Sequence, residues 1–285
     1  MLRVCTRNEF DKYCDFMYGL AMDLTKSGYP TYCDGIKTKE MFVQRRMKAF
    51  ERDTEEMLLF VHEGEIQGLI QYYWIPEDHY LGTNCFTIHM AAEQTLSEFL
   101  TYVGERFNGY DVFLGFPVEN HAAVAFLSQQ GAECIENSCN NTAFLDKIDP
   151  MPESRDLIRV DRENYDCFSS LHIQIEGDMY WNSERILEDL DSWAIFVKKK
   201  NGEPQGAVYY TSVTDGWFEI FGIDICRNAY RPELFTELLN AALLDAKRRN
   251  GKYMTFFCDE NYEDAALACG FTFVGNYLCY KIRLV

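Results

Sequence analysis

The stretch Gly64-Glu65-Ile66-Gln67-Gly68 has a close copy further along the chain, Gly202-Glu203-Pro204-Gln205-Gly206. An apolar run precedes each stretch and a tyrosine-rich run follows it, which predicts a β-hairpin turning at each pair of glycines. The chain has 285 residues, a length that favours two domains over one. Two similar hairpins this far apart therefore predict an internal repeat.

The same order of elements surrounds both hairpins. Upstream, we expect a short strand followed by two helices. Downstream, the apolar run 86–90 matches 221–225, and each is followed by a helix and a short buried strand. A second helix then ends at Gly131 in one copy and Gly270 in the other, and two strands are expected to close each copy.

A polar segment with two prolines, Pro150 and Pro152, joins the two copies. Proline continues neither a helix nor a central strand, so this segment is expected to be a linker. The sequence predicts two domains of the α/β class, residues 1–150 and 151–285, each with a mixed sheet and flanking helices.

The composition is that of a folded protein with a strong negative charge. Apolar residues make up 47% and charged residues 25%, and the net charge is −18. Neither half is basic, so nucleic acid and an acidic membrane surface are not expected partners, whereas an amine is. No secretory leader or long apolar run occurs, and we expect a cytoplasmic location.

The eleven cysteines do not indicate a disulfide framework. Their number is odd, no C-x-x-C pair occurs and the chain is long, so most are expected to be small buried hydrophobic residues. The five histidines are scattered without the spacing of a zinc site. No metal site is predicted.

One helical segment carries a resemblance to a known family. It reads Asn120-His121-Ala122-Ala123-Val124-Ala125-Phe126-Leu127-Ser128-Gln129-Gln130-Gly131. This segment is similar to the N-x-x-A-x-x-F-Y-x-x-x-G-F signature of the GNAT family of acyl-CoA-dependent N-acyltransferases. Residues 261–271 keep the end of the signature and are two residues shorter. Together with the element order, the chain resembles two tandem GNAT domains.

The resemblance implies an acetyl-CoA site in the second copy. There, the backbone of Ile223 and Ile225 would hold the pantetheine arm. The pyrophosphate would lie on the following loop and helix start, where backbone amides and the helix dipole favour anions. The loop residues implied in this role are Cys226, Arg227, Asn228, Ala229, Tyr230 and Arg231.

Both copies depart from the family pattern at this loop. Tyr230 and Pro232 stand where the family has glycines. The first copy has no basic residue between its strand and helix, and Glu93 there would repel phosphate. We therefore expect the first domain to be degenerate and the second to hold the acyl-CoA site.

Catalysis in this family needs a base for the amine and an acid for the leaving thiolate. The tyrosine that often serves as the acid is replaced by Leu127 and Ala266. Tyr262 is the candidate substitute, and Tyr277 and Tyr280, which are also nearby in sequence, are the alternatives. Glu219 is the candidate base because the resembled strand often carries a glutamate there. A structural alternative is that Glu219 is an outward polar residue of an alternating strand, with Asp224 on the opposite face.

Three functions follow from these residues. The first is N-acetyl transfer from acetyl-CoA to an amine of a small molecule or peptide. The second is a non-catalytic, ligand-binding or regulatory protein that has lost the acyl-CoA site. The third, peptidyl transfer from aminoacyl-tRNA, is disfavoured by the charge of −18.

Overall fold

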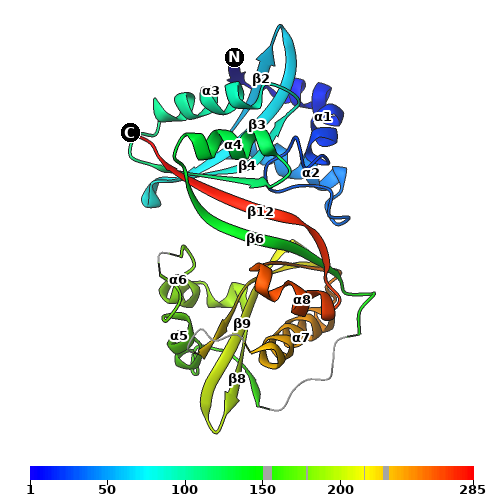
Figure 1. Cartoon of the computed structure of the whole chain (residues 1–285), viewed down its shortest axis with the longest axis vertical. Helices are drawn as coiled ribbons and strands as arrows, with labels where there is room; N and C mark the ends of the chain where they lie inside the picture. Colours follow the sequence, from blue (N-terminus) through cyan, green and yellow to red (C-terminus); the bar gives the residue numbers. More distant parts are fainter. Residues whose placement is uncertain (150–155, 178, 215, 227–230) are drawn as a thin grey trace. The chain divides into compact units, whose positions relative to one another are not determined.

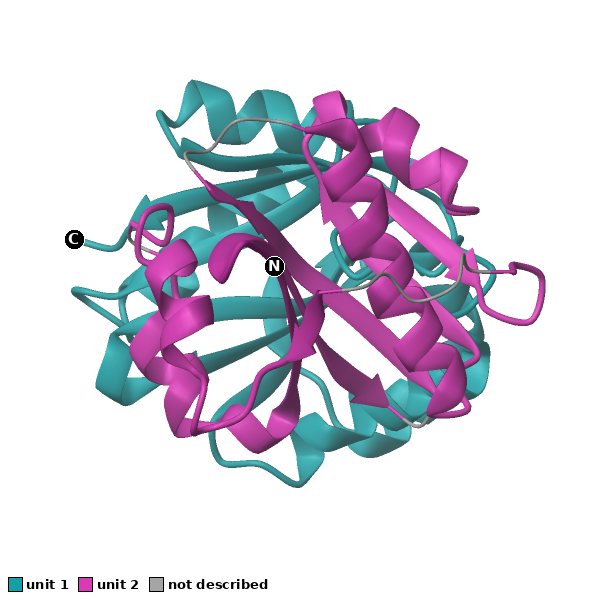
Figure 2. Ribbon diagram, turned by 90° about the horizontal axis from the view of Figure 1, so that it is seen from below, with its two compact units in different colours: residues 1–138, 275–285 teal, residues 139–274 magenta. Residues whose placement is uncertain are grey.

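The computed structural model describes residues 1–149, 156–177, 179–214, 216–226 and 231–285. Within them the chain forms two compact units, coloured separately in Figure 2. Unit 1 holds residues 1–138 and 275–285, and unit 2 holds residues 139–274. Each unit is a mixed β-sheet with helices on both faces, so the predicted fold class is confirmed.

Unit 1 has the strand order β1-β2-β3-β4-β5-β12. Its strands are β1 (Leu2–Val4), β2 (Glu55–His62), β3 (Glu65–Ile75), β4 (Tyr80–Ile88), β5 (Asp111–Pro117) and β12 (Thr272–Arg283). Its helices are α1 (Arg7–Ala21), α2 (Lys39–Met47), α3 (Ala92–Gly104) and α4 (His121–Gln129). Strand β4 pairs antiparallel with β3 and parallel with β5.

The two faces of the unit 1 sheet carry different helices (Figure 1). Helices α1 and α2 pack Phe10 and Phe42 on one face. Helices α3 and α4 pack Phe99 and Leu127 on the other. All four side chains are essentially inaccessible to solvent, and burying each one stabilises the fold by about 1.5–3 kcal/mol.

Unit 2 has the strand order β6-β11-β10-β9-β8-β7. Its strands are β6 (Glu133–Phe144), β7 (Leu157–Arg159), β8 (Trp193–Lys200), β9 (Glu203–Thr214), β10 (Trp217–Ile225) and β11 (Tyr253–Cys258). Its helices are α5 (Asp166–His172), α6 (Ser183–Glu188), α7 (Pro232–Arg248) and α8 (Glu260–Ala268). Helices α7 and α8 cover one sheet face, and α5 and α6 cover the other.

The end of each copy differs from the sequence prediction. After the glycine that ends α4 or α8, the structure has one long strand, β6 or β12, instead of two short ones. The second part of β6 pairs with β11 in unit 2, from Cys139 to Phe144. The second part of β12 pairs with β5 in unit 1, from Tyr277 to Arg283.

The compact units therefore differ from a division of the chain at Pro150. Residues 139–149 precede the linker but lie in unit 2, and residues 275–285 end the chain but lie in unit 1. The physical reason is that an edge strand can be stabilised by pairing with any available sheet edge. An alternating sequence pattern predicts a strand but does not predict which sheet that strand joins.

Candidate active site

The central strands of unit 2 separate part-way along their length. Strands β10 and β11 pair in parallel from Trp217 to Ile220 on β10, opposite Tyr253 to Phe256. Both strands continue beyond this point, to Ile225 and Cys258, without pairing to each other. In the described part of the chain, the only recorded backbone partner of β10 after Ile220 is β9. We call this part, in which β10 and β11 do not pair with each other, the opening.

Unit 1 has the corresponding opening between β4 and β5, where pairing ends at Gly82 and Phe113. The pairing of β4 with β3 and of β10 with β9 shows which residues of the two units correspond. Gly68 lies opposite Ile88, and Gly206 lies opposite Ile225. Phe86 thus corresponds to Ile223. The sequence alignment of 86–90 with 221–225 was wrong by two positions, since it matched Phe86 to Phe221.

This alignment shows which backbone groups face each opening. In unit 1, the carbonyl of Phe86 and the amide of Ile88 point into the opening, where they bond Gly28 and Lys26. The same register in unit 2 directs the carbonyl of Ile223 and the amide of Ile225 into the opening. These two residues are the ones that the resemblance to the GNAT family assigned to the pantetheine arm.

A β-bulge changes the face on which Asp224 lies. Ile220 pairs with Tyr210 and Gly222 pairs with Tyr209, so Phe221 is the additional residue. The bulge puts Asp224 on the same sheet face as Glu219, the face covered by α5 and α6. The expectation that these two carboxylates lie on opposite faces was wrong, because strict alternation takes no account of a bulge.

Glu219 lies in the middle of a row of polar cross-strand neighbours. Its partners are Thr211 on β9 and Thr255 on β11, and Thr255 Oγ1 lies 3.4 Å from Glu219 Oε2. The carboxylate is half-buried. It lies just before the point where the two strands separate, so its position fits a base acting beside the opening.

Tyr262 lies on the other face of the sheet. Its ring, on α8, stacks on Phe235 of α7 with the centroids 4.7 Å apart. The structure therefore does not bring Tyr262 and Glu219 together on one face. Leu127 and Ala266, which occupy the family's usual acid position, are fully buried in the two cores. Neither position can present a proton donor to a substrate.

The predicted phosphate loop is described only at its two ends. Arg227, Asn228, Ala229 and Tyr230 lie outside the described residues. Cys226 is half-buried at the end of β10, and Arg231 lies at the start of α7. Arg231 donates from Nη2 to the backbone carbonyl of Gln205 at 2.8 Å. Its Nε is buried without a partner among the described residues, and one donor is thus left at the helix start.

A buried polar cluster lies under the separated part of β10, and no motif in the sequence indicates it. His172 Nδ1 lies 2.8 Å from Asp224 Oδ2, and His172 Nε2 lies 2.9 Å from the carbonyl of Trp181. Tyr209 also bonds Asp224, while burial and that carboxylate raise the pKa of its hydroxyl. Asp224 stands between Ile223 and Ile225, so the cluster holds the strand that lines the opening.

The two ionisable groups of this cluster have shifted pKa values. Burial favours the neutral His172 ring, but the hydrogen bond and the charge of Asp224 outweigh it and raise the pKa of His172. Burial also raises the pKa of Asp224, against the opposing effect of His172. A buried pair of this kind keeps a proton between its members.

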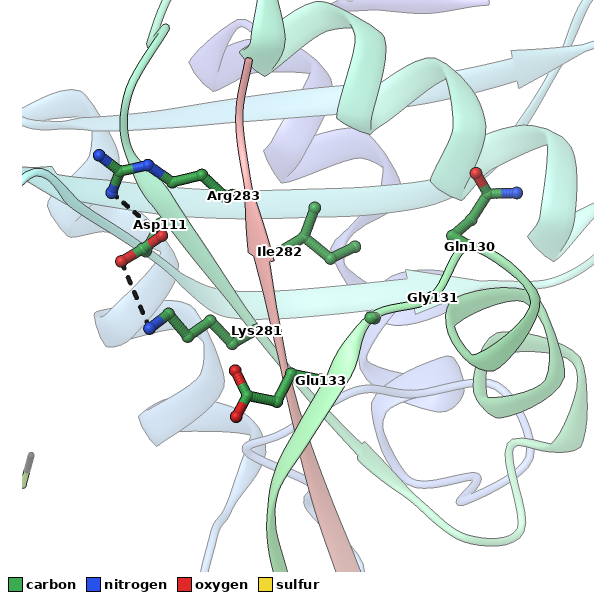
Figure 3. A pocket seen from close by; sticks show the side chains of 8 residues that line it. Asp111, Gln130, Gly131, Glu133, Lys281, Ile282 and Arg283 are labelled. Atoms are coloured by element: carbon green, nitrogen blue, oxygen red, sulfur yellow. Dashed lines mark ion pairs between the residues drawn. The ribbon is translucent and has the colours of Figure 1, made fainter.

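A separate hollow of about 590 Å³ lies in unit 1, where β5 begins and β12 ends (Figure 3). Lys281 Nζ and Arg283 Nη1 point toward the Asp111 carboxylate, at 3.6 and 3.1 Å. Glu133 also lines the hollow. Because Asp111 and Glu133 offset the two cations, this hollow offers little attraction to a phosphate group.

Comparison with known proteins identifies the fold. No family model and no curated protein matches the chain. A solved tandem GNAT protein from the clavulanic acid biosynthesis pathway aligns with 100% of this chain and 98% of its own, at 10% identity and a TM-score of 0.55. The chain has a tandem GNAT fold.

Two further structures with GNAT folds agree. A GCN5-related N-acetyltransferase from Sphaerobacter thermophilus has a TM-score of 0.66 and 13% identity, covering 100% of this chain and 95% of its own. The glucosamine N-acetyltransferase region of a fungal multi-domain GH3 β-N-acetylglucosaminidase has a TM-score of 0.62 and 9% identity. The match covers 99% of this chain and 38% of the fungal chain. Identities this low establish the fold, which alone does not fix an activity. No described helix of this tandem GNAT fold is long and apolar enough to cross a membrane.

Proposed function

We propose that the chain is an N-acyltransferase that transfers an acetyl or other acyl group from a CoA thioester to an amine of a small molecule or peptide. Unit 2 carries the reaction. The observation that supports this most is the opening between β10 and β11, into which the Ile223 carbonyl and Ile225 amide point. An extended pantetheine arm with amide groups can pair with such a strand edge.

The start of α7 supplies the second part of the donor site. The helix is long, begins at Pro232 immediately after the loop, and has no side-chain cap. Its amides and dipole favour a pyrophosphate, and Arg231 adds a positive charge beside them. Arg227 would add another from the loop.

Glu219 acts as the base, directly or through a water molecule. The amine nitrogen attacks the thioester carbonyl carbon, its proton passes to Glu219, and the carbon–sulfur bond breaks as the new carbon–nitrogen bond forms. Tyr262 would give the leaving thiolate its proton from the opposite sheet face. No covalent enzyme intermediate is needed, and the negative protein attracts a cationic acceptor.

Thermal unfolding with and without acetyl-CoA tests the donor site. A ligand that binds only the folded chain raises its melting temperature. We expect a clear rise, reduced in Arg231→Ala but not in Arg248→Ala, which removes an exposed arginine from the other end of α7. No rise at millimolar acetyl-CoA would instead support the non-catalytic alternative, which the buried Ala266 already favours.

Turnover with a panel of amines tests the base. Glu219→Gln should bind acetyl-CoA normally and lower kcat by about 10²-fold or more, the usual contribution of a general base. Glu203→Gln, at an exposed hairpin position, is the matched control and should react normally. Normal turnover of Glu219→Gln would exclude Glu219 as the base.

A further inference from the structure

The opening of unit 1 contains a piece of the chain itself. Lys26–Tyr29, part of the loop between α1 and α2, runs between β4 and β5 and bonds both strands. Gly28 N donates to Phe86 O at 2.6 Å, and Ile88 N donates to Lys26 O at 2.8 Å. On the other side, Tyr29 N donates to Gly115 O at 2.9 Å. We name Lys26–Tyr29 the inserted segment.

The inserted segment pairs as a strand does. Ser27 forms an antiparallel bridge with Thr87, and both residues are buried. The Phe86 carbonyl and Ile88 amide that it uses correspond to the Ile223 carbonyl and Ile225 amide in unit 2. The segment thus satisfies the backbone groups that the proposed function assigns to pantetheine in the other unit.

Side chains hold the inserted segment from three directions. Asn120 Nδ2, at the cap of α4, donates to Ser27 O at 3.2 Å, and Asn120 is almost fully buried. The ring of Tyr29 lies against Tyr277, with the centroids 4.4 Å apart. At Gly28, a Cβ atom would lie 2.9 Å from Gly115 O and 3.1 Å from Phe86 Cβ, so only glycine fits without a shift.

The corresponding loop of unit 2 takes a different course. It is shorter, spanning residues 173–182 against 22–38 in unit 1. Its described part bonds locally: Met179 N donates to Glu176 O, and Glu176 Oε2 accepts from Ser183 N at 2.7 Å. None of its described residues has a recorded backbone hydrogen bond to β10 or β11.

We propose that the inserted segment permanently fills the acyl-CoA position of unit 1, so that each chain binds one acyl-CoA, in unit 2. The proposal has two halves. The positive half, that unit 2 binds acyl-CoA, rests on the proposed function. The negative half, that unit 1 does not bind it, rests on the contacts of Lys26–Tyr29 alone. Binding at unit 1 would require the loss of three backbone hydrogen bonds and of the Asn120 contact.

The stoichiometry of acetyl-CoA binding to the full chain, measured by titration calorimetry, tests both halves. We expect one molecule per chain. Two molecules per chain would overturn the proposal. No binding at all would reject the proposed function of unit 2 and with it the positive half.

Amide hydrogen exchange tests the inserted segment independently of any ligand. The amides of Gly28, Tyr29 and Ile88 should exchange at least about 10²-fold more slowly than in an unstructured chain, with and without acetyl-CoA. Rapid exchange at all three would show that the segment does not occupy the opening. This result would overturn the negative half even if one acetyl-CoA binds.

Two variants link that protection to the fit of the segment. Gly28→Ala should speed exchange at Tyr29 and Ile88 by about tenfold or more, whereas Gly104→Ala, where a Cβ has open space, should not. If Gly28→Ala does not fold, Asn120→Asp serves instead. It keeps the oxygen that caps Ala123 N and removes the donor to Ser27. Unchanged exchange in the variant that folds would contradict the proposal.

Discussion

His172 and Asp224 form a buried pair in which the ring nitrogen Nδ1 and the carboxylate oxygen Oδ2 are 2.8 Å apart. The other ring nitrogen lies beside the Trp181 carbonyl, which only accepts, so Nε2 carries a hydrogen. One proton must then lie between Nδ1 and Oδ2. The pair joins helix α5 to the part of β10 beyond the bulge.

The stability of unit 2 should depend on this proton. The pKa of folded His172 is raised above its usual value of 6.5, so the folded state binds more protons than the unfolded state just above that pH. This contribution is fully present below pH 6.5 and is lost as pH rises through the folded pKa. Urea unfolding from about pH 6 to 9 should therefore give a falling free energy of unfolding.

The variant His172→Gln should be less stable and should lose that pH dependence. Exposed His121 provides the matched control, since His121→Gln leaves the pair intact. An equal slope in wild type and His172→Gln would show that His172 is not the group responsible.

The Tyr209 hydroxyl lies so close to Gly222 that no side chain fits at this position. A Cβ atom on Gly222 would lie 2.2 Å from Tyr209 Oη, so Gly222→Ala must displace the ring that bonds Asp224. We expect a loss of about 1–3 kcal/mol in the free energy of unfolding, as for other overpacked sites. Gly19→Ala, in helix α1 with open space around it, should gain about 0.5–1 kcal/mol. Denaturant titration compares the two, and equal effects would contradict the close contact.

Cys134 should be the thiol that reacts first. All eleven cysteines are free, and Cys134 is the exposed one among them. Burial raises the pKa of Cys5 and Cys258 to about 12, so neither forms a thiolate at neutral pH. A thiol reagent added to native protein should show one fast phase that Cys134→Ser removes and Cys226→Ser retains. A fast phase in Cys134→Ser would show that another thiol becomes accessible.

The Glu56 carboxylate accepts hydrogen bonds from three side chains of unit 1. Its Oε2 accepts from Tyr72 Oη at 2.6 Å, Tyr102 Oη at 2.8 Å and Arg106 Nη1 at 2.6 Å. Glu56→Gln removes the charge and should cost about 1–3 kcal/mol of unfolding free energy. Exposed Glu105→Gln should change stability by less than about 0.5 kcal/mol. The same denaturant titration separates them, and a neutral Glu56→Gln would mean that the cluster does not stabilise unit 1.

The sequence predicted the elements of this fold better than their register. The glycines at 64 and 202 lie in equivalent turns, Gly68 and Gly206 lie at equivalent strand positions, and most helices and strands lie where the apolar spacing put them. The bulge at Phe221 was not predictable, because an extra strand residue leaves no mark on composition. It explains the wrong face for Asp224. It does not explain the misaligned repeat, because β4 has an extra residue, Asn84, at the corresponding position.

The candidate site was predictable only in its backbone part. Ile223 and Ile225 followed from the family resemblance, and the register puts both at the opening. The contact between His172 and Asp224 joins residues far apart in sequence, and Lys26–Tyr29 is an ordinary polar loop by composition. Such long-range contacts depend on packing, which local patterns do not encode.

The pairing of β6 with β11 and of β12 with β5 has a consequence for cutting the chain. A cut between α4 and β7 at the predicted linker would give two fragments, each keeping a strand that completes the other fragment's sheet. Neither fragment alone could reproduce a compact unit. We therefore expect the nicked protein to elute as one species of full mass, and its halves to separate only in denaturant.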